Sequence, residues 1–201
     1  MFELRDALVG EELEVARVHV RSWQAAYRGL IDQAFLDSLR AEERARGYRF
    51  GASDPGAPRT IVALREGRIF AFAATSRSRD ADAPDAGELC ALYVDPSCWR
   101  TGVGALLLER ACERMRSQGF AEAILWVLIG NTGAERFYEA HGWRADGARR
   151  DECVYGVEST VRRYRRALGA VASAPEEPCA GSGSSAGAAP SATAPSAAPA
   201  G

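Results

Sequence analysis

The chain reads Trp99-Arg100-Thr101-Gly102-Val103-Gly104-Ala105 between a strand that Asp95-Pro96 ends and a long helix that begins at Val103. Glycines in such a loop let backbone N–H groups approach an anion closely, and the helix dipole adds about half a positive charge at the same end. The segment predicts a phosphate or pyrophosphate site, with a tight strand-to-helix turn as the alternative. The Walker pattern is excluded because its Gly-Lys-Ser/Thr is missing, and Leu107 replaces the third glycine of the dinucleotide fingerprint.

Alternating strand and helix patterns around this loop predict a layered α/β domain. Strands are expected at 2–6, 60–64, 68–75, 88–94 and 123–129, and more weakly at 143–149 and 157–164. Helices are expected at 11–28, at 33–46, from 103 to a stop at 119, and from 132 to 142. Asp32 is the expected N-cap of the second helix, Thr132-x-x-Glu135 is a capping box, and Glu66-Gly67 is a hairpin turn.

The composition limits the classes of partner. Of the 201 residues 25 are basic, all of them arginine, and 27 are acidic, which gives a formal charge of −2 and no case for a nucleic-acid partner. No stretch approaches the roughly 20 apolar residues that span a bilayer, and the N-terminus carries no secretion signal, so we expect a cytoplasmic protein without a membrane partner. The five cysteines are widely spaced and form no CxxC pair, so neither a disulfide framework nor a metal site is expected.

Residues 1–169 are expected to form one domain. Ala, Ser, Pro and Gly dominate residues 170–201, and so little apolar side chain predicts a disordered tail. The GxSxG pattern at 183–187 lacks the flanking strand and helix of a hydrolase elbow and is interpreted as chance.

A second informative segment runs from Asn131 to Trp143 and reads NTGAERFYEAHGW. Ala134 and Tyr138 are four residues apart on a helix, so the tyrosine shares a face with a small residue that leaves space beside it. Tyr138 could donate a proton there, and a role in packing is the alternative.

Together the two segments resemble motifs A and B of the GNAT (GCN5-related) N-acetyltransferase superfamily, R/Q-x-x-G-x-G/A and N-x-x-A-x-x-F-Y-x-x-x-G-F/W. The resemblance is strongest over residues 88–145 and extends to most of 1–168. Trp99 departs from the usual Arg or Gln, which puts a side-chain contact at that position in doubt. The resemblance implies a GNAT fold, α/β (α+β), with a mixed, mostly antiparallel sheet of about seven strands, about four helices, and a splay between strands 88–94 and 123–129.

In that family the pantetheine arm of acetyl-CoA inserts between the splayed strands. The resemblance implies that Leu92, Tyr93 and Val94 line this arm, that residues 100–105 hold the pyrophosphate mainly through backbone amides, and that Asn131 contacts the cofactor near its pantetheine. Core packing is the alternative for Leu92 and Val94, and helix capping is the alternative for Asn131. No metal is implied.

The family reaction is the attack of an amine on a thioester. An amine with a pKa of about 10 is protonated at neutral pH, so a base is needed or the site must lower that pKa. Glu88 stands 11 residues before Trp99, the offset of a catalytic glutamate in histone-acetylating members, and is the implied base. A solvated strand-end glutamate is the alternative. Tyr138 is the implied acid that protonates the leaving CoA thiolate.

The acceptor is the least constrained part of this reading. Trp23 and Tyr27 line the acceptor pocket by the resemblance, or they belong to the core. His19 and His141 are single and are interpreted as surface or capping residues. Strand 125–129 carries no acid, unlike members that acetylate a ribosomal protein N-terminus, which favours a small-molecule amine over a peptide amine.

The sequence therefore predicts an acetyl-CoA-dependent N-acetyltransferase that works by direct attack in a ternary complex. Two alternatives remain: a GNAT-like module that binds acyl-CoA without catalysis, and an enzyme that uses a different acyl group. The resemblance also leaves a homodimer open as the assembly.

Overall fold

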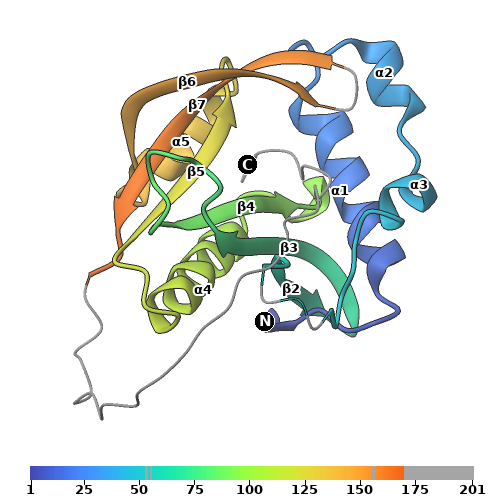
Figure 1. The fold of residues 1–201 in the computed structure, drawn as a ribbon. Helices are drawn as coiled ribbons and strands as arrows, with labels where there is room; N and C mark the ends of the chain where they lie inside the picture. Colours follow the sequence, from blue (N-terminus) through green and yellow to red (C-terminus); the bar gives the residue numbers. More distant parts are fainter. Residues whose placement is uncertain (53, 55, 155–156, 170–201) are drawn as a thin grey trace.

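A computed structural model describes residues 1–52, 54, 56–154 and 157–169. Within these residues one seven-stranded sheet has the order β1-β2-β3-β4-β5-β7-β6, and its neighbours are antiparallel except for β4 and β5 (Figure 1). The strands are β1 Glu3–Asp6, β2 Arg59–Arg65, β3 Arg68–Arg77, β4 Gly87–Val94, β5 Glu122–Leu128, β6 Arg144–Val154 and β7 Val157–Ala167. The expected mixed, mostly antiparallel sheet is confirmed.

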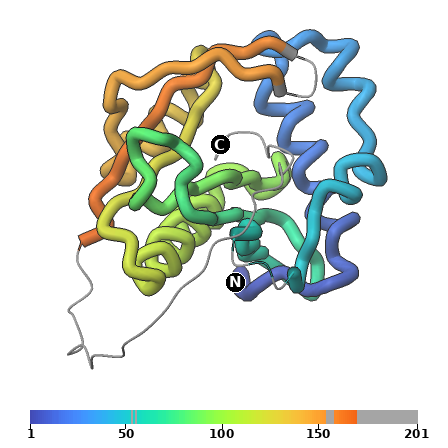
Figure 2. Tube along the Cα trace, in the orientation of Figure 1, coloured from blue at the N-terminus to red at the C-terminus, as the bar shows by residue number. Residues whose placement is uncertain are grey.

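Helices cover both faces of the sheet. They are α1 Glu12–Ala26, α2 Gln33–Ser38, α3 Ala41–Ala45, α4 Val103–Ser117 and α5 Thr132–Ala140, with a 3-10 turn η1 at Pro96–Cys98. The side chains of α4 and α5 share one core cluster with alternate residues of the strands, and α1 and α2 share the other. We call these the α4 face and the α1 face. Figure 2 shows the β6–β7 hairpin reaching across towards α1 and α2.

The expected helix at 33–46 is wrong in its extent, because the chain forms α2 and α3 with an extended break between them. Leu39 and Arg40 have ψ angles of 133° and 130°. The Arg40 guanidinium donates to the carbonyls of Asp37 and Leu39, which a continuous helix would bond to its own N–H groups. The expected N-cap is confirmed, since the Asp32 carboxylate accepts the N–H of Phe35 at 2.9 Å.

The expected hairpin between β2 and β3 is confirmed. Glu66 and Gly67 have φ angles of 54° and 73°, and two consecutive positive values match the type I′ turn that suits the twist of antiparallel strands.

β4 and β5 separate shortly after they pair. In the described part of the chain their parallel pairing covers Gly87 with Ala123 and Glu88 with Ile124. Next to this point the β3–β4 register shifts, so that Cys90 is an inserted residue and forms a bulge. The N–H of Asp95 donates to the carbonyl of Phe70 on β3 at 2.7 Å. By strand alternation, the backbone groups of Leu92 and Val94 then point to the open side that faces β5.

The expected disordered tail, 170–201, lies outside the described residues. Among the residues described, no helix combines the length and apolarity needed to cross a bilayer. The same residues contain no group of three His, Cys, Asp or Glu side chains placed to hold a metal ion.

Candidate active site

The N-terminus of α4 has the geometry of an anion site. Gly102 is its N-cap with a φ of 84°, and among the described residues no side chain caps it. Its first backbone bond runs from the N–H of Leu106 to the carbonyl of Gly102, so the N–H groups of residues 103–105 precede it and lack an acceptor within the helix. A Cβ on Gly102 would meet open space, so the φ alone requires glycine here.

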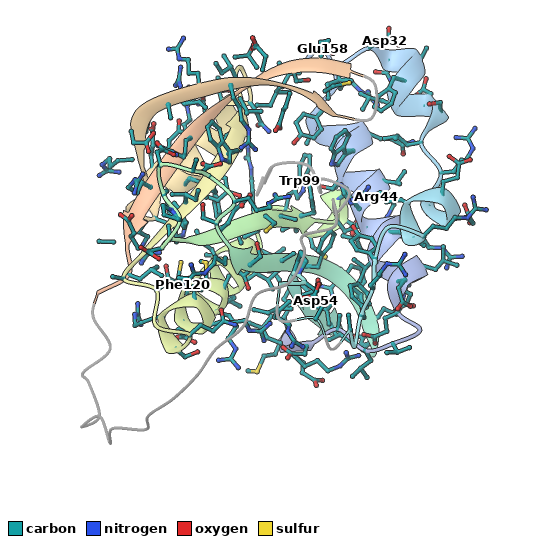
Figure 3. The ribbon with its side chains drawn as sticks, in the orientation of Figure 1. Asp32, Arg44, Asp54, Trp99, Phe120 and Glu158 are labelled. Atoms are coloured by element: carbon teal, nitrogen blue, oxygen red, sulfur yellow. The ribbon has the colours of Figure 1, made fainter. Side chains whose placement is uncertain are left out.

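The loop before this helix is braced by its own side chains. Arg100 adopts a φ of 60°, and the Thr101 hydroxyl donates to the carbonyl of Cys98 at 2.7 Å. The Trp99 indole N–H donates to the carbonyl of Val94 at 2.9 Å, so this residue fastens the end of β4. Figure 3 labels Trp99 at this end of the strand. With the Val94 carbonyl engaged, Leu92 offers the N–H and C=O that face the opening.

Two buried groups on α5 lack partners. Asn131 is the N-cap, and its side-chain oxygen accepts the N–H of Ala134 at 3.2 Å, which corrects the capping box expected at Thr132. The Asn131 amide nitrogen and the Tyr138 hydroxyl are buried and have no hydrogen-bond partner among the described residues. Unsatisfied buried polar groups are costly, so these two are positions where a bound molecule fits. Burial raises the pKa of Tyr138 above its ordinary value of 10, so it keeps its proton at neutral pH.

Glu88 lies in β4 immediately before the strands separate, and its side chain is 5 % exposed. Arg79 donates to both of its carboxylate oxygens, at 3.1 and 3.4 Å. These two hydrogen bonds hold the carboxylate at the point where the two strands separate. The solvated strand-end alternative therefore does not describe Glu88.

The β3–β4 loop that carries Arg79 is fastened to the far side of the sheet. Arg163 on β7 donates to Asp80 at 3.0 Å and to both carboxylate oxygens of Asp82 at 2.7 Å. Asp80 also accepts from the Trp126 indole on β5 and from Arg150 on β6. The pKa of Asp82 falls to about 2, chiefly because of its hydrogen bonds with Arg163. These contacts fix the loop next to Glu88.

The two aromatic residues predicted to line the acceptor pocket pack together on the α1 face. Trp23 and Tyr27 are each 3 % exposed, with ring centroids 4.8 Å apart, and belong to the core cluster of that face. Burial raises the pKa of Tyr27 well above 10, and the neighbouring Tyr93 and Tyr138 raise it further.

A cavity of about 500 Å³ lies on the α1 face. Phe72, Ala74 and Ser76 of β3 form its floor, and Cys90 and Ala91 bring it to the bulge of β4. Its walls include His19, Arg44, Tyr48 and Arg79, whereas Trp23 and Tyr27 are not among the described residues that line it.

The sequence analysis interpreted His19 as a surface or capping residue. The structure instead buries it, with 3 % of the residue exposed. Its ring stacks on Tyr93 with centroids 4.3 Å apart, and its Nδ1 atom lies 2.6 Å from the Tyr48 hydroxyl. Burial, and then the charge of Arg44, hold the pKa of His19 well below its usual 6.5. His141 does cap a helix, because its Nδ1 contacts the carbonyl of Phe137 at 2.8 Å near the end of α5.

Comparison with known proteins gives consistent results. The sequence model of the acetyltransferase (GNAT) family matches residues 19–143. An uncharacterized N-acetyltransferase of Bacillus subtilis, YuaI, is 31 % identical over 142 residues, which cover 70 % of this chain and 79 % of the relative.

Solved structures share the fold at low sequence identity. The Escherichia coli ribosomal-protein-S18-alanine N-acetyltransferase superposes with a TM-score of 0.60 at 17 % identity, over 88 % of this chain and all of the other. The PaiA N-acetyltransferase of Thermoplasma acidophilum, solved in complex with coenzyme A, gives a TM-score of 0.62 at 18 % identity, over 83 % of this chain and 99 % of the other.

Proposed function

The chain belongs to the acetyltransferase (GNAT) family, and from that premise we propose that it transfers an acetyl group from acetyl-CoA to an amine. The observation that carries the proposal is the open edge of β4, which starts after Glu88 and ends beside the uncapped N-terminus of α4. A long molecule with an anionic end fits an edge that terminates at such a helix.

The residues present fit acetyl-CoA. The N–H groups of residues 100–105 would hold its pyrophosphate, and the Leu92 backbone would pair with the pantetheine arm as an added strand does. The buried amide nitrogen of Asn131 is an unused donor on the same side. Tyr93 contributes through its ring, which stacks on His19, because strand alternation directs its backbone towards β3. Val94 lines the arm through its side chain and N–H.

The chain's own groups supply the proton transfers. Acetyl-CoA provides the acetyl group as a thioester, which an amine attacks directly in a ternary complex. Glu88, held by Arg79, accepts the proton of the amine, directly or through one water. Tyr138 keeps its proton in the buried site until the sulfur departs, and would then transfer that proton so that CoA leaves as the thiol.

The acceptor we favour is a small-molecule amine, because β5 carries no acid over residues 125–128. Trp23 and Tyr27 act on it only through the packing that shapes the opening.

Calorimetric titration with acetyl-CoA, followed by an amine panel assayed for released CoA thiol, tests this function. We expect saturable binding and acceptor-dependent thiol release. Failure to bind acetyl-CoA contradicts the proposal as a whole. Binding without release for any amine contradicts the transfer step, and points to an acyl-CoA-binding module or to another acyl group.

A further inference from the structure

The cavity on the α1 face carries an excess of positive charge. The described residues that line it include Arg44, Arg49, Arg77, Arg79 and Asp54. Arg79 is paired with Glu88 and Arg77 with Asp85, so Arg44 and Arg49 supply the excess over the one acid of the lining, Asp54. The acid is exposed, and its carboxylate accepts the N–H of Gly56 in its own loop. Figure 3 labels Arg44 beside α1 and α3. A cavity with this balance of charge favours an anion.

Arg44 is held in place at the wall of the cavity. Its Nε donates to Nδ1 of His19 at 3.1 Å, and its guanidinium lies 5.3 Å from the ring centroid of Tyr48. Nδ1 of His19 is therefore the acceptor atom of a neutral ring, since an arginine N–H can only donate. The positive charge of this pair belongs to Arg44. Arginine held in this way is suited to a carboxylate or a phosphate, which its planar fork matches.

The floor of the cavity runs from this arginine to the bulge of β4. His19 lies beside Phe72, with ring centroids 5.7 Å apart, so Arg44 stands at the Phe72 end of the floor. Ala74 pairs with Ala91 next to the bulge of β4. Two residues of a strand span about 7 Å, so the anion site and the bulge are separated by about the length of a small amino compound.

We propose that this cavity binds the acceptor, and that the acceptor is an amine that also carries an anionic group, a carboxylate or a phosphate, which Arg44 holds. The proposal rests on the acetyl transfer proposed above and narrows its substrate class. Phe50, Phe72 and the ring of Tyr48 line the same space and accommodate an apolar part of the acceptor. The charged groups of the acceptor then do not have to be buried against these apolar side chains, which would cost free energy.

The test uses pairs of amines that differ by the anion alone. Each compound is titrated calorimetrically into the full chain, in the presence and in the absence of coenzyme A. The pairs compared are phenylalanine and 2-phenylethylamine, tryptophan and tryptamine, and phosphoethanolamine and ethanolamine. We expect the anionic member of at least one pair to bind about tenfold or more tightly than its partner, as an ionic hydrogen bond gives. The responding pair separates a carboxylate from a phosphate.

Variants at the C-terminal end of α3 then test whether Arg44 causes the preference for the anionic member. Arg44→Gln should abolish the preference for the anionic member, and Arg44→Lys should keep part of it, because the charge stays and the fork is lost. Arg46→Gln is the matched control, since Arg46 is exposed at the end of the same helix and is not among the lining residues.

Three outcomes would overturn the proposal: equal affinity within every pair, no binding in any pair, or an unchanged preference in Arg44→Gln. None of them depends on turnover. The binding of acetyl-CoA and the release of CoA thiol, measured separately, decide the transfer function, so the two failures can be distinguished.

Discussion

The Arg79 guanidinium donates to both carboxylate oxygens of Glu88, and this pair stands at the last position where β4 and β5 are joined. A carboxylate so placed is shielded from bulk water and adjacent to the opening. The pairing also restricts its motion, because the loop that carries Arg79 is fastened through Arg163.

Replacing Glu88 by glutamine should therefore remove the base and keep the shape. We expect kcat/KM for an amine acceptor to fall by about a hundredfold or more, the range of general base catalysis. Glu113→Gln is the control, because it breaks an exposed arginine–glutamate pair on α4. If the Glu88→Gln enzyme retains kcat/KM within about twofold of the wild type, another group takes the proton.

Tyr138→Phe tests the proposed acid. The hydroxyl has no partner among the described residues, so its removal should leave the thermal midpoint unchanged or slightly higher. We expect kcat to fall about tenfold to a thousandfold while the affinity for acetyl-CoA is kept. Tyr164→Phe removes a hydroxyl from another buried tyrosine on β7 and should keep kcat. A Tyr138→Phe enzyme with unchanged kcat would show that the hydroxyl only packs.

Gly102→Ala tests the anion site. The φ of 84° is unfavourable for alanine by about 1 kcal/mol, and relief of that strain would turn the N–H groups of the loop away from an anion. We expect the Kd of acetyl-CoA to rise about tenfold or more. Gly119 ends the same helix with a φ of 91° and equally open space, so Gly119→Ala carries the same strain at the other end. If both variants lose the same affinity for acetyl-CoA, the loss comes from a less stable helix and not from the anion site.

Local patterns predicted most of the strands and helices, because each depended on neighbours in the sequence. The hairpin turn at Glu66-Gly67 and the cap at Asp32 are of this kind. The break at Leu39 and Arg40 was not predicted, since helical propensity continues through it. The extended conformation is favoured by side-chain hydrogen bonds to backbone carbonyls, from Arg40 to Asp37 and Leu39 and from Gln24 to Leu36. Asn131, and not Thr132, is the N-cap of α5. Both are polar residues that can cap a helix, and they are adjacent, so the sequence alone could not choose between them.

The residues of the candidate site also fall into those that local sequence predicts and those that it does not. The glycine loop and the helix of Tyr138 are contiguous segments with family spacing, so they could be identified directly. The cavity could not, because His19, Arg44 and Arg79 come from three separate elements that only the tertiary fold brings together. For Arg79 the sequence offered one weak signal of its pairing with Glu88. The two residues lie near opposite ends of the loop that joins the antiparallel strands β3 and β4.

Arg163→Gln tests the fastening of the β3–β4 loop. The side chain is 5 % exposed and pairs with Asp80, which is 9 % exposed. Removal of Arg163 takes away one of the two arginines that pair with Asp80 and leaves Arg150 in place. We therefore expect a loss of about 2 kcal/mol in the free energy of unfolding, measured by urea denaturation, between the values for a surface pair and for a fully broken buried pair. The exposed Arg149 on the neighbouring strand provides the control variant Arg149→Gln. A loss below about 1 kcal/mol would mean that the network contributes no more than surface pairs do.

The buried His19 makes stability depend on pH near neutrality. In the folded state its pKa is held well below the usual value, whereas the unfolded chain takes up a proton near pH 6.5. The unfolded state then binds more protons below that pH, so the free energy of unfolding should fall as pH is lowered from about 7 to about 5.5. Urea midpoints measured across this range follow it directly.

His19→Gln should flatten that dependence, because glutamine takes up no proton in either state. His141→Gln leaves the buried ring in place, so its midpoints should keep the slope of the wild type. If His19→Gln retains the full pH dependence, the proton taken up on unfolding belongs to another group, and His19 is charged in the folded protein. Arg44, which donates to its Nδ1, would then face a like charge at 3.1 Å, an arrangement that the geometry of this pair does not support.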